Sequence, residues 1–262
     1  MRIVVCVKEV LDPAAVNNYA LAGKLRIAAD GRTPEVAAIP RLINGYDEQA
    51  MEAALRIRDQ GIDCKIVAVS IGPDQKNLLK HCAALGADEI VEIHPGDIAL
   101  DGQVVANILA AWITQTGGAD LVLCGRQASD DDQGVVPLLL AEKLDFAAAT
   151  LARAVEIDGT NVKVVRATAD GDEVVQGKLP AVVTVSNEIG TPRFPTAKSK
   201  MAARKMSPVE FDTPALGLTA QQLQPAVVLL KQYVPKVQGN CQFLTGGPAD
   251  VARQLIEKIR AA

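Results

Sequence analysis

The chain has 262 residues, of which 49% are hydrophobic and only 3% are aromatic. A chain of this length can bury a large core, and a core of Val, Ile, Leu and Ala is typical of parallel strands covered by helices. The net charge of −4 argues against a nucleic-acid-binding protein that relies on a global positive field. The sequence contains no run of about 18 apolar residues, so no membrane-spanning helix is predicted.

The first strand is predicted at residues 2–7, directly after Met1. No targeting segment is visible, so a cytoplasmic location is expected. The chain has five cysteines, an odd number with no CxxC pair, and only two histidines. These spacings predict reduced, mostly buried thiols, and they predict no metal site of the zinc or iron–sulfur type.

Strands and helices alternate through the first 150 residues. Strands are predicted at 64–71, 88–93 and 120–124, and helices at about 46–60, 74–85 and 102–116. This alternation predicts an α/β fold with a doubly wound, mostly parallel sheet of Rossmann-like nucleotide-binding topology. Asn44 is placed to cap the helix at 46–60, and Asp30-Gly31 predicts a hairpin-like excursion before it.

The pattern changes after residue 150. Short strands at 150–156, 162–167 and 173–177 predict an antiparallel extension, and residues 180–185 form another apolar strand. Prolines then interrupt residues 190–225, and Thr245 to Pro248 begins a final helix. We therefore divide the chain into a nucleotide-binding α/β domain (1–188), a Pro-rich, partly basic arm for partner recognition and subunit wrapping (189–240), and a C-terminal helix (241–262).

In a doubly wound sheet, ligands bind at the carboxyl ends of the strands. The most informative segment there is the loop at residues 125–134, which follows a strand and opens onto a helix. Its small residues allow a close approach of the backbone, and amides at the helix start can hold an anion. Its three adjacent aspartates suit ribose hydroxyls, or they stabilise the helix start.

Several enzyme classes are excluded by missing motifs. The sequence contains neither a GxGxxG fingerprint after a strand nor a GxxxxGK[ST] P-loop, which excludes an ordinary NAD(P) dehydrogenase and a P-loop NTPase. The two histidines occupy unrelated positions, so no catalytic residue is predicted. Residues 191–205 contain five basic residues and no acid, which indicates either a solvated surface or a docking surface for an acidic or phosphate-bearing partner.

Four segments resemble the electron transfer flavoprotein β subunit family, over essentially the full chain. Val4 to Asp12 is similar to the family's opening strand and turn, and Asn44 to Glu48 to its helix start. Residues 125–132 resemble its G-[KR]-Q-A-x-D-x-D loop. Asn187-Glu188 with residues 192–196 resembles its N-x-P-R-Y segment.

The resemblance implies a heterodimer with an α subunit whose C-terminal domain carries a redox-active FAD. The β subunit of this family binds AMP, or a second FAD in members that bifurcate electrons. It is an electron carrier subunit and not an enzyme on its own, and it passes electrons between a dehydrogenase, expected to be of the acyl-CoA type, and a downstream acceptor.

The resemblance also implies two sets of site residues. The expected cofactor contacts are Cys6, Asn44, Gly45, Tyr46, Asp47, Ile71, Gly125, Arg126, Gln127, Ala128, Ser129, Asp130, Asp131, Asp132, Gln133, Gly134, Val135 and Val136. The expected partner-docking residues are Pro192, Arg193, Phe194, Ala197, Lys198, Lys200 and Met201.

Three positions depart from the family pattern. Val135-Val136-Pro137 replaces a Gln-[TV]-Gly helix start, and Pro137 has no amide to offer a phosphate. Gly45 replaces a proline, and Ala197 stands where the family places an anchoring leucine. Two alternatives stay open: a bifurcating subunit with a second FAD and NADH oxidation, which Asp131 disfavours, and a stand-alone adenine-nucleotide-binding module, which the basic arm disfavours.

Overall fold

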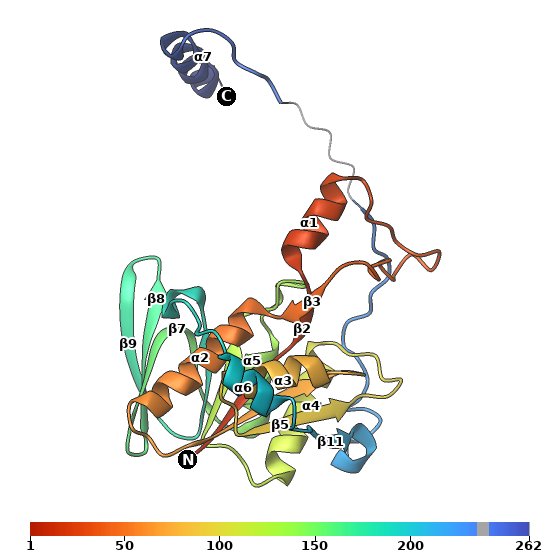
Figure 1. Ribbon diagram of the computed structural model, residues 1–262, viewed down its shortest axis with the longest axis vertical. Helices are drawn as coiled ribbons and strands as arrows, with labels where there is room; N and C mark the ends of the chain where they lie inside the picture. Colours follow the sequence, from red (N-terminus) through yellow and green to blue (C-terminus); the bar gives the residue numbers. More distant parts are fainter. Residues whose placement is uncertain (235–240, 262) are drawn as a thin grey trace.

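The computed structural model describes residues 1–234 and 241–261. Its centre is a nine-stranded sheet in the order β11-β5-β4-β1-β6-β10-β7-β8-β9 (Figure 1). Six of these strands pair only in parallel: β1 (Arg2–Cys6), β4 (Lys65–Ile71), β5 (Glu89–His94), β6 (Leu121–Gly125), β10 (Ala181–Val185) and β11 (Val209–Asp212). The predicted doubly wound α/β sheet is confirmed.

The antiparallel extension is also confirmed. It consists of β7 (Ala147–Asp158), β8 (Asn161–Thr168) and β9 (Gly171–Lys178). The start of β7 pairs in parallel with β10, and its second half pairs antiparallel with β8. One long strand therefore joins the parallel sheet to the antiparallel extension.

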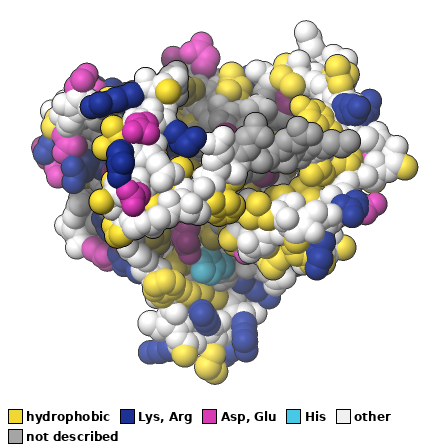
Figure 2. Space-filling view, turned by 90° about the horizontal axis from the view of Figure 1, so that it is seen from above, with side chains coloured by type: hydrophobic (Ala, Val, Ile, Leu, Met, Phe, Trp, Pro, Cys, Tyr) yellow, Lys and Arg dark blue, Asp and Glu magenta, His cyan; other side chains and the backbone are white. Residues whose placement is uncertain are grey.

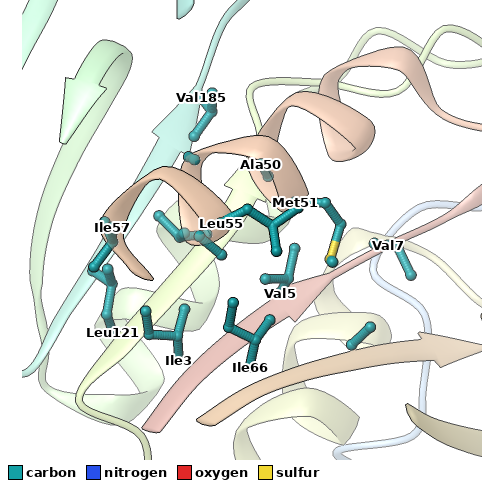
Figure 3. Packing of buried hydrophobic residues seen from close by; sticks show 14 of the residues in the cluster. Ile3, Val5, Val7, Ala50, Met51, Leu55, Ile57, Ile66, Leu121 and Val185 are labelled. Atoms are coloured by element: carbon teal, nitrogen blue, oxygen red, sulfur yellow. The ribbon is translucent and has the colours of Figure 1, made fainter. Parts of the chain in front are cut away.

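Helices cover both faces of the parallel sheet. On one face, α2 (Gly45–Asp59) and α3 (Lys76–Leu85) pack on the strands, and Figure 3 shows Met51 and Leu55 of α2 above Val5 and Ile66. On the other face lie α4 (Gly102–Gln115) and α5 (Val136–Leu144), where Trp112 is completely buried. The helices predicted at about 46–60, 74–85 and 102–116 are thus confirmed as α2, α3 and α4.

The order of the strands creates a switch point. The chain passes from β1 to β4 and β5 on one side, and then crosses to β6 on the other side of β1. Cys6 and Cys124 are register partners at the ends of β1 and β6. Connections leave these two ends in opposite directions, and such a point is where open α/β sheets bind ligands.

The excursion before α2 contains more than the predicted hairpin-like turn. It contains the short antiparallel strands β2 (Glu9–Leu11) and β3 (Arg41–Ile43) and the unpredicted helix α1 (Pro13–Leu21). Around Asp30, only a single bridge joins Ile27 to Pro34. The Asp30 carboxylate closes a tight turn by accepting from the amides of residues 32 and 33, and backbone hydrogen bonds from Ala28 to Thr33 and from Glu35 to Arg26 flank the bridge.

The segment predicted as an arm contributes to the sheet. It contains α6 (Ala197–Ala203), β11 and the short helix η2 (Thr213–Leu216), and η1 (Asn187–Ile189) lies at its start. β11 pairs with β5. The pairing is possible because Pro208 and Pro214 lie just outside this strand, so every residue within it keeps its backbone amide. Leu218 and Leu223 also pack against the core, so the first part of the predicted arm belongs to the sheet domain.

The predicted C-terminal helix is present as α7 (Pro248–Ala261), which has no buried residue and lies away from the sheet (Figure 1). Among the described residues, no helix has the length and hydropathy that crossing a membrane requires. On the face shown in Figure 2, Lys and Arg side chains are dispersed among Asp and Glu side chains, with hydrophobic side chains towards the centre.

Candidate functional site

A cleft of about 990 Å³ opens at the switch point between β1 and β6. Its floor consists of strand-end residues, among them Cys6, Ile71 and Cys124, and the start of α4 and residues 225–231 complete its walls. Cavities that bind small molecules and cofactors measure roughly 300–1,000 Å³. The volume therefore suits a nucleotide-sized ligand.

Asn44 ties the loop at residues 125–134 to the start of α2. Its side-chain nitrogen Nδ2 donates to the backbone carbonyl of Gln127 at 2.8 Å, and its Oδ1 accepts from the backbone amide of Ser129 at 3.2 Å. Asn44 thus occupies the predicted N-cap position, but its side chain makes no capping hydrogen bond. The side chain positions the loop instead.

Asp47 lies beneath the same loop and is only 7% exposed. Its carboxylate accepts from the amide of Lys8 at 2.8 Å and from the amide of Gly125 at 3.1 Å. Burial raises the pKa of Asp47 to about 7, although these two hydrogen bonds favour the charged form. Gly125 makes this contact possible, because a Cβ at that position would lie 2.4 Å from Asp47 Oδ1.

The three aspartates of the loop are engaged by neighbouring side chains. Lys8 Nζ lies 2.7 Å from Asp130 Oδ1 and 3.4 Å from Asp131 Oδ2, while Asp132 Oδ1 accepts from Gln127 at 2.8 Å. Of these three aspartates, only Asp131 lines the cleft. The lysine offsets part of the negative charge, which reduces the repulsion that three carboxylates would exert on an anionic ligand.

Two helix starts meet at the cleft. A Cβ on Gly102, the first residue of α4, would lie 2.5 Å from the Val135 side chain that precedes α5. The amides of Val135 and Val136 precede the first intrahelical hydrogen bonds of α5, so they are free to hold an anion. Pro137 has no amide to add to them.

Asp101 connects the start of α4 to the late segment of the chain. Its Oδ1 accepts from the amide of Val104 at 2.8 Å, and its Oδ2 accepts from the amides of Ala226 and Val227 at 2.6 and 3.0 Å. Burial opposes ionisation of Asp101, but these amides prevail and lower its pKa. The segment at 225–231 is thereby held along one wall of the cleft.

The structure brings most of the expected cofactor contacts together. Twelve of them line the cleft: Cys6, Asn44, Asp47, Ile71, Gly125, Gln127, Ala128, Asp131, Gln133, Gly134, Val135 and Val136. The other six are Gly45, Tyr46, Arg126, Ser129, Asp130 and Asp132, and they lie outside the lining. Tyr46 instead stacks with the guanidinium of Arg126, which lies 5.6 Å from the ring centroid.

Several lining residues escaped the sequence reasoning. They include Arg32, Asp101, Gly102 and the segment at 225–231. Asp101 could have been found, because an aspartate directly before a predicted helix is typical of an N-cap, and this helix follows a predicted strand. The late segment gave no such signal, because its place depends on hydrogen bonds to a residue more than a hundred positions earlier.

The expected docking residues fall into two groups. Arg193 is held on α2, where its guanidinium contacts Glu52 Oε2 at 2.8 Å and Asp59 Oδ2 at 2.7 Å. Phe194 and Met201 are 87% and 67% exposed. Thr196 caps α6 by accepting from the amide of Ser199, which places Ala197 at the first position of that helix. Arg193 therefore anchors the segment, while its neighbours are accessible.

Comparisons with known proteins agree with this geometry. The model of the electron transfer flavoprotein domain family matches residues 36–216. The chain is 31% identical to the electron transfer flavoprotein subunit beta of Thermoanaerobacterium thermosaccharolyticum over 271 residues, covering 100% of this chain and 98% of that protein. It is 34% identical to the human subunit beta over 208 residues, covering 78% of each chain.

A third relative is the caffeyl-CoA reductase–Etf complex subunit CarD of Acetobacterium woodii, which is 29% identical over 99% of this chain and 98% of its own length. The family match covers well over half of the chain, and the relatives align over most of their length. The chain belongs to the electron transfer flavoprotein β subunit family.

Proposed function

We propose that this chain binds AMP or FAD in the cleft and works as the β subunit of a heterodimeric electron transfer flavoprotein. With an α subunit that carries the redox-active FAD, it passes electrons between a dehydrogenase of the acyl-CoA type and a downstream acceptor in the cytoplasm. The observation that carries the proposal is the cleft at the switch point, closed by a loop that Asn44 and Asp47 hold in place.

The groups in the cleft fit an adenine nucleotide. Val69, Ile71 and Leu109 provide an apolar wall for a base, and Asp131 offers a carboxylate to ribose hydroxyls. The amides of Val135 and Val136 lie where a phosphate would find donors. A bound FAD would supply redox chemistry, whereas AMP would be structural, and the residues of the cleft themselves only bind and orient.

Exposed apolar side chains support assembly with another subunit. Leu255, Ile256 and Ile259 of α7 are 49%, 50% and 67% exposed, and Leu230 and Tyr233 are 79% and 75% exposed. Monomeric proteins rarely leave such series of apolar side chains in water. We assign these segments to contact with the α subunit.

The proposal is tested by co-expressing the chain with its α subunit, denaturing the purified complex, and identifying the released nucleotides. One FAD and one AMP for each heterodimer is the expected result. Two FAD would favour the bifurcating alternative, for which the likeness to CarD is the supporting observation. A chain that stays monomeric beside α would overturn the heterodimer and favour a stand-alone nucleotide-binding module.

A further inference from the structure

Three side chains capable of binding a metal meet at the edge of the sheet, outside the lining of the cleft. Glu92 and His94 are two residues apart on β5, so they lie on one face of the strand. Glu210 on β11 is the register partner of Glu92. One nitrogen or oxygen atom from each of the three residues lies within 4.8 Å of the others.

Glu92 is completely buried. Its Oε1 accepts from the amide of Gln75 at 2.7 Å, but its Oε2 has no hydrogen-bonding partner within residues 1–234 and 241–261. Buried carboxylates are normally paired or bound to a metal. The side chain directly opposite on β11 is another carboxylate, and like charges in register destabilise a sheet. The pair therefore needs a cation between its members.

The neighbouring side chains of His94 and Lys76 meet this need only in part. His94 Nδ1 lies 3.9 Å from Glu92 Oε1, and Nε2 lies 3.8 Å from Glu210 Oε2, distances that are too long for hydrogen bonds. Lys76 Nζ is 3.1 Å from Glu210 Oε1. The lysine thus binds one oxygen of Glu210 and leaves the other facing the imidazole.

We propose that Glu92, His94 and Glu210 bind a divalent transition-metal cation of the Zn²⁺ type. Such ions accept imidazole nitrogen and carboxylate oxygen at roughly 2.0–2.2 Å, which puts neighbouring ligand atoms about 3.4 Å apart. The three ligand atoms lie within 4.8 Å of one another, so they would have to approach by at most about 1.4 Å to reach this value. The cation would neutralise Glu92 and fasten β11, which follows α6, to the edge of the sheet.

No local sequence pattern indicated this site, because Glu210 lies far along the chain from Glu92 and His94. Sequence spacing detects ligands that share one loop or helix, but parallel pairing of β5 and β11 brings these residues together. The expectation of no metal site therefore rested on local patterns only.

The test uses the full-length chain, stripped of metal with EDTA and titrated with ZnCl₂ in a calorimeter. We expect one equivalent to bind and to raise the melting temperature. His94→Gln and Glu210→Gln should each weaken binding by about tenfold or more. His81→Gln is the matched control, because His81 also pairs with a glutamate, Glu48 at 2.9 Å, and should bind as the parent chain does.

A second readout excludes the cysteines as ligands. Co²⁺ bound at the proposed site should show visible absorption without the charge-transfer band of a thiolate ligand. Melting curves recorded without metal establish that each variant folds. Absence of Zn²⁺ binding below millimolar concentration, equal binding by all three variants, or a thiolate band would each overturn the proposal.

Discussion

Helix α2 carries two buried carboxylates that the protein holds in opposite ways. At the cleft, Asp47 accepts from the backbone amides of Lys8 and Gly125, and its burial raises its pKa to about 7. About one and a half turns later, Glu52 is equally buried but accepts from Arg193 and Arg56. Burial opposes ionisation of Glu52 as well, yet the guanidinium hydrogen bonds lower its pKa.

The difference shows how one helix serves two purposes. At the cleft, Asp47 joins the ends of two strands through neutral backbone amides, and this arrangement leaves space and further backbone amides for a ligand. At the start of the arm, full opposite charges fix Arg193 on the helix. Changes in pH and single substitutions should therefore act differently at the two ends of α2.

The largest effect should come from pH at the cleft end. A carboxyl whose pKa is raised from 3.8 to about 7 on folding stabilises the protein below about pH 4, and this contribution is lost as the pH rises through 7. Asp47→Asn is neutral at every pH. The free energy of unfolding of the parent chain relative to Asp47→Asn should fall between pH 4 and pH 8, by at most about 4 kcal/mol.

Urea unfolding of both proteins at several pH values measures this difference directly, because the other titrating groups are common to the two. Curves that run parallel from pH 4 to pH 8 would show that Asp47 ionises as an exposed carboxyl does.

Asp47 also shows how far the sequence could lead. Its place in the first turn of a helix was readable, as were the parallel sheet and the loop at 125–134. The raised pKa was not, because the burial that raises it comes from segments distant in the sequence, among them Gly125 at the end of β6. Local patterns specify elements, whereas contacts between distant segments decide the electrostatics.

The arm end illustrates the same limit. The basic run around Arg193 indicated either a solvated surface or a docking surface, and the structure shows that this arginine binds the domain itself. Neither Glu52 nor Asp59 could be assigned to it from spacing, since more than a hundred residues intervene. The segment at 225–231 escaped prediction for the same reason.

Glu52→Gln should give the next largest effect. It removes the buried charge that holds Arg193 and Arg56, and hydrogen bonds to charged groups contribute about 1.5–3 kcal/mol each. We expect a loss of about 2–3 kcal/mol in the free energy of unfolding at pH 7. Because a lowered pKa stabilises only above the unfolded value of 4.5, the loss should shrink as the pH falls below that value.

Glu156→Gln is the matched control, since its exposed pair with Lys163 should contribute less than about 0.5 kcal/mol. Limited trypsin digestion should also cleave near Lys198 sooner in Glu52→Gln than in the control. If the two variants lose equal stability, Arg193 is not anchored as the structure shows.

Asn44→Ala tests the tie between α2 and the cleft loop. The substitution deletes two hydrogen bonds, so we expect a loss of about 1–2 kcal/mol in stability and weaker binding of AMP by the heterodimer, measured by calorimetry. Asn44→Asp keeps the acceptor for the amide of Ser129 but turns a carboxylate oxygen towards the carbonyl of Gln127, so it should lose at least as much stability. Asn77→Ala on the exposed face of α3 is the control, and equal AMP affinity in all of them would contradict a role for the tie.

The smallest effect on stability, and the sharpest test of the arm, should come from Phe194→Ser. Phe194 is 87% exposed, so its replacement should change the free energy of unfolding by less than about 0.5 kcal/mol.

Phe243 is 88% exposed in the C-terminal segment and provides a matched variant, Phe243→Ser. If the two segments serve different partners, Phe194→Ser should slow flavin reduction by the dehydrogenase while the heterodimer stays intact. Phe243→Ser should weaken assembly with α, measured by analytical ultracentrifugation, and leave the reduction rate of assembled complex unchanged. The same defect in both variants would mean that one continuous surface meets one partner, and Arg193 would then orient that surface for subunit assembly and not for docking.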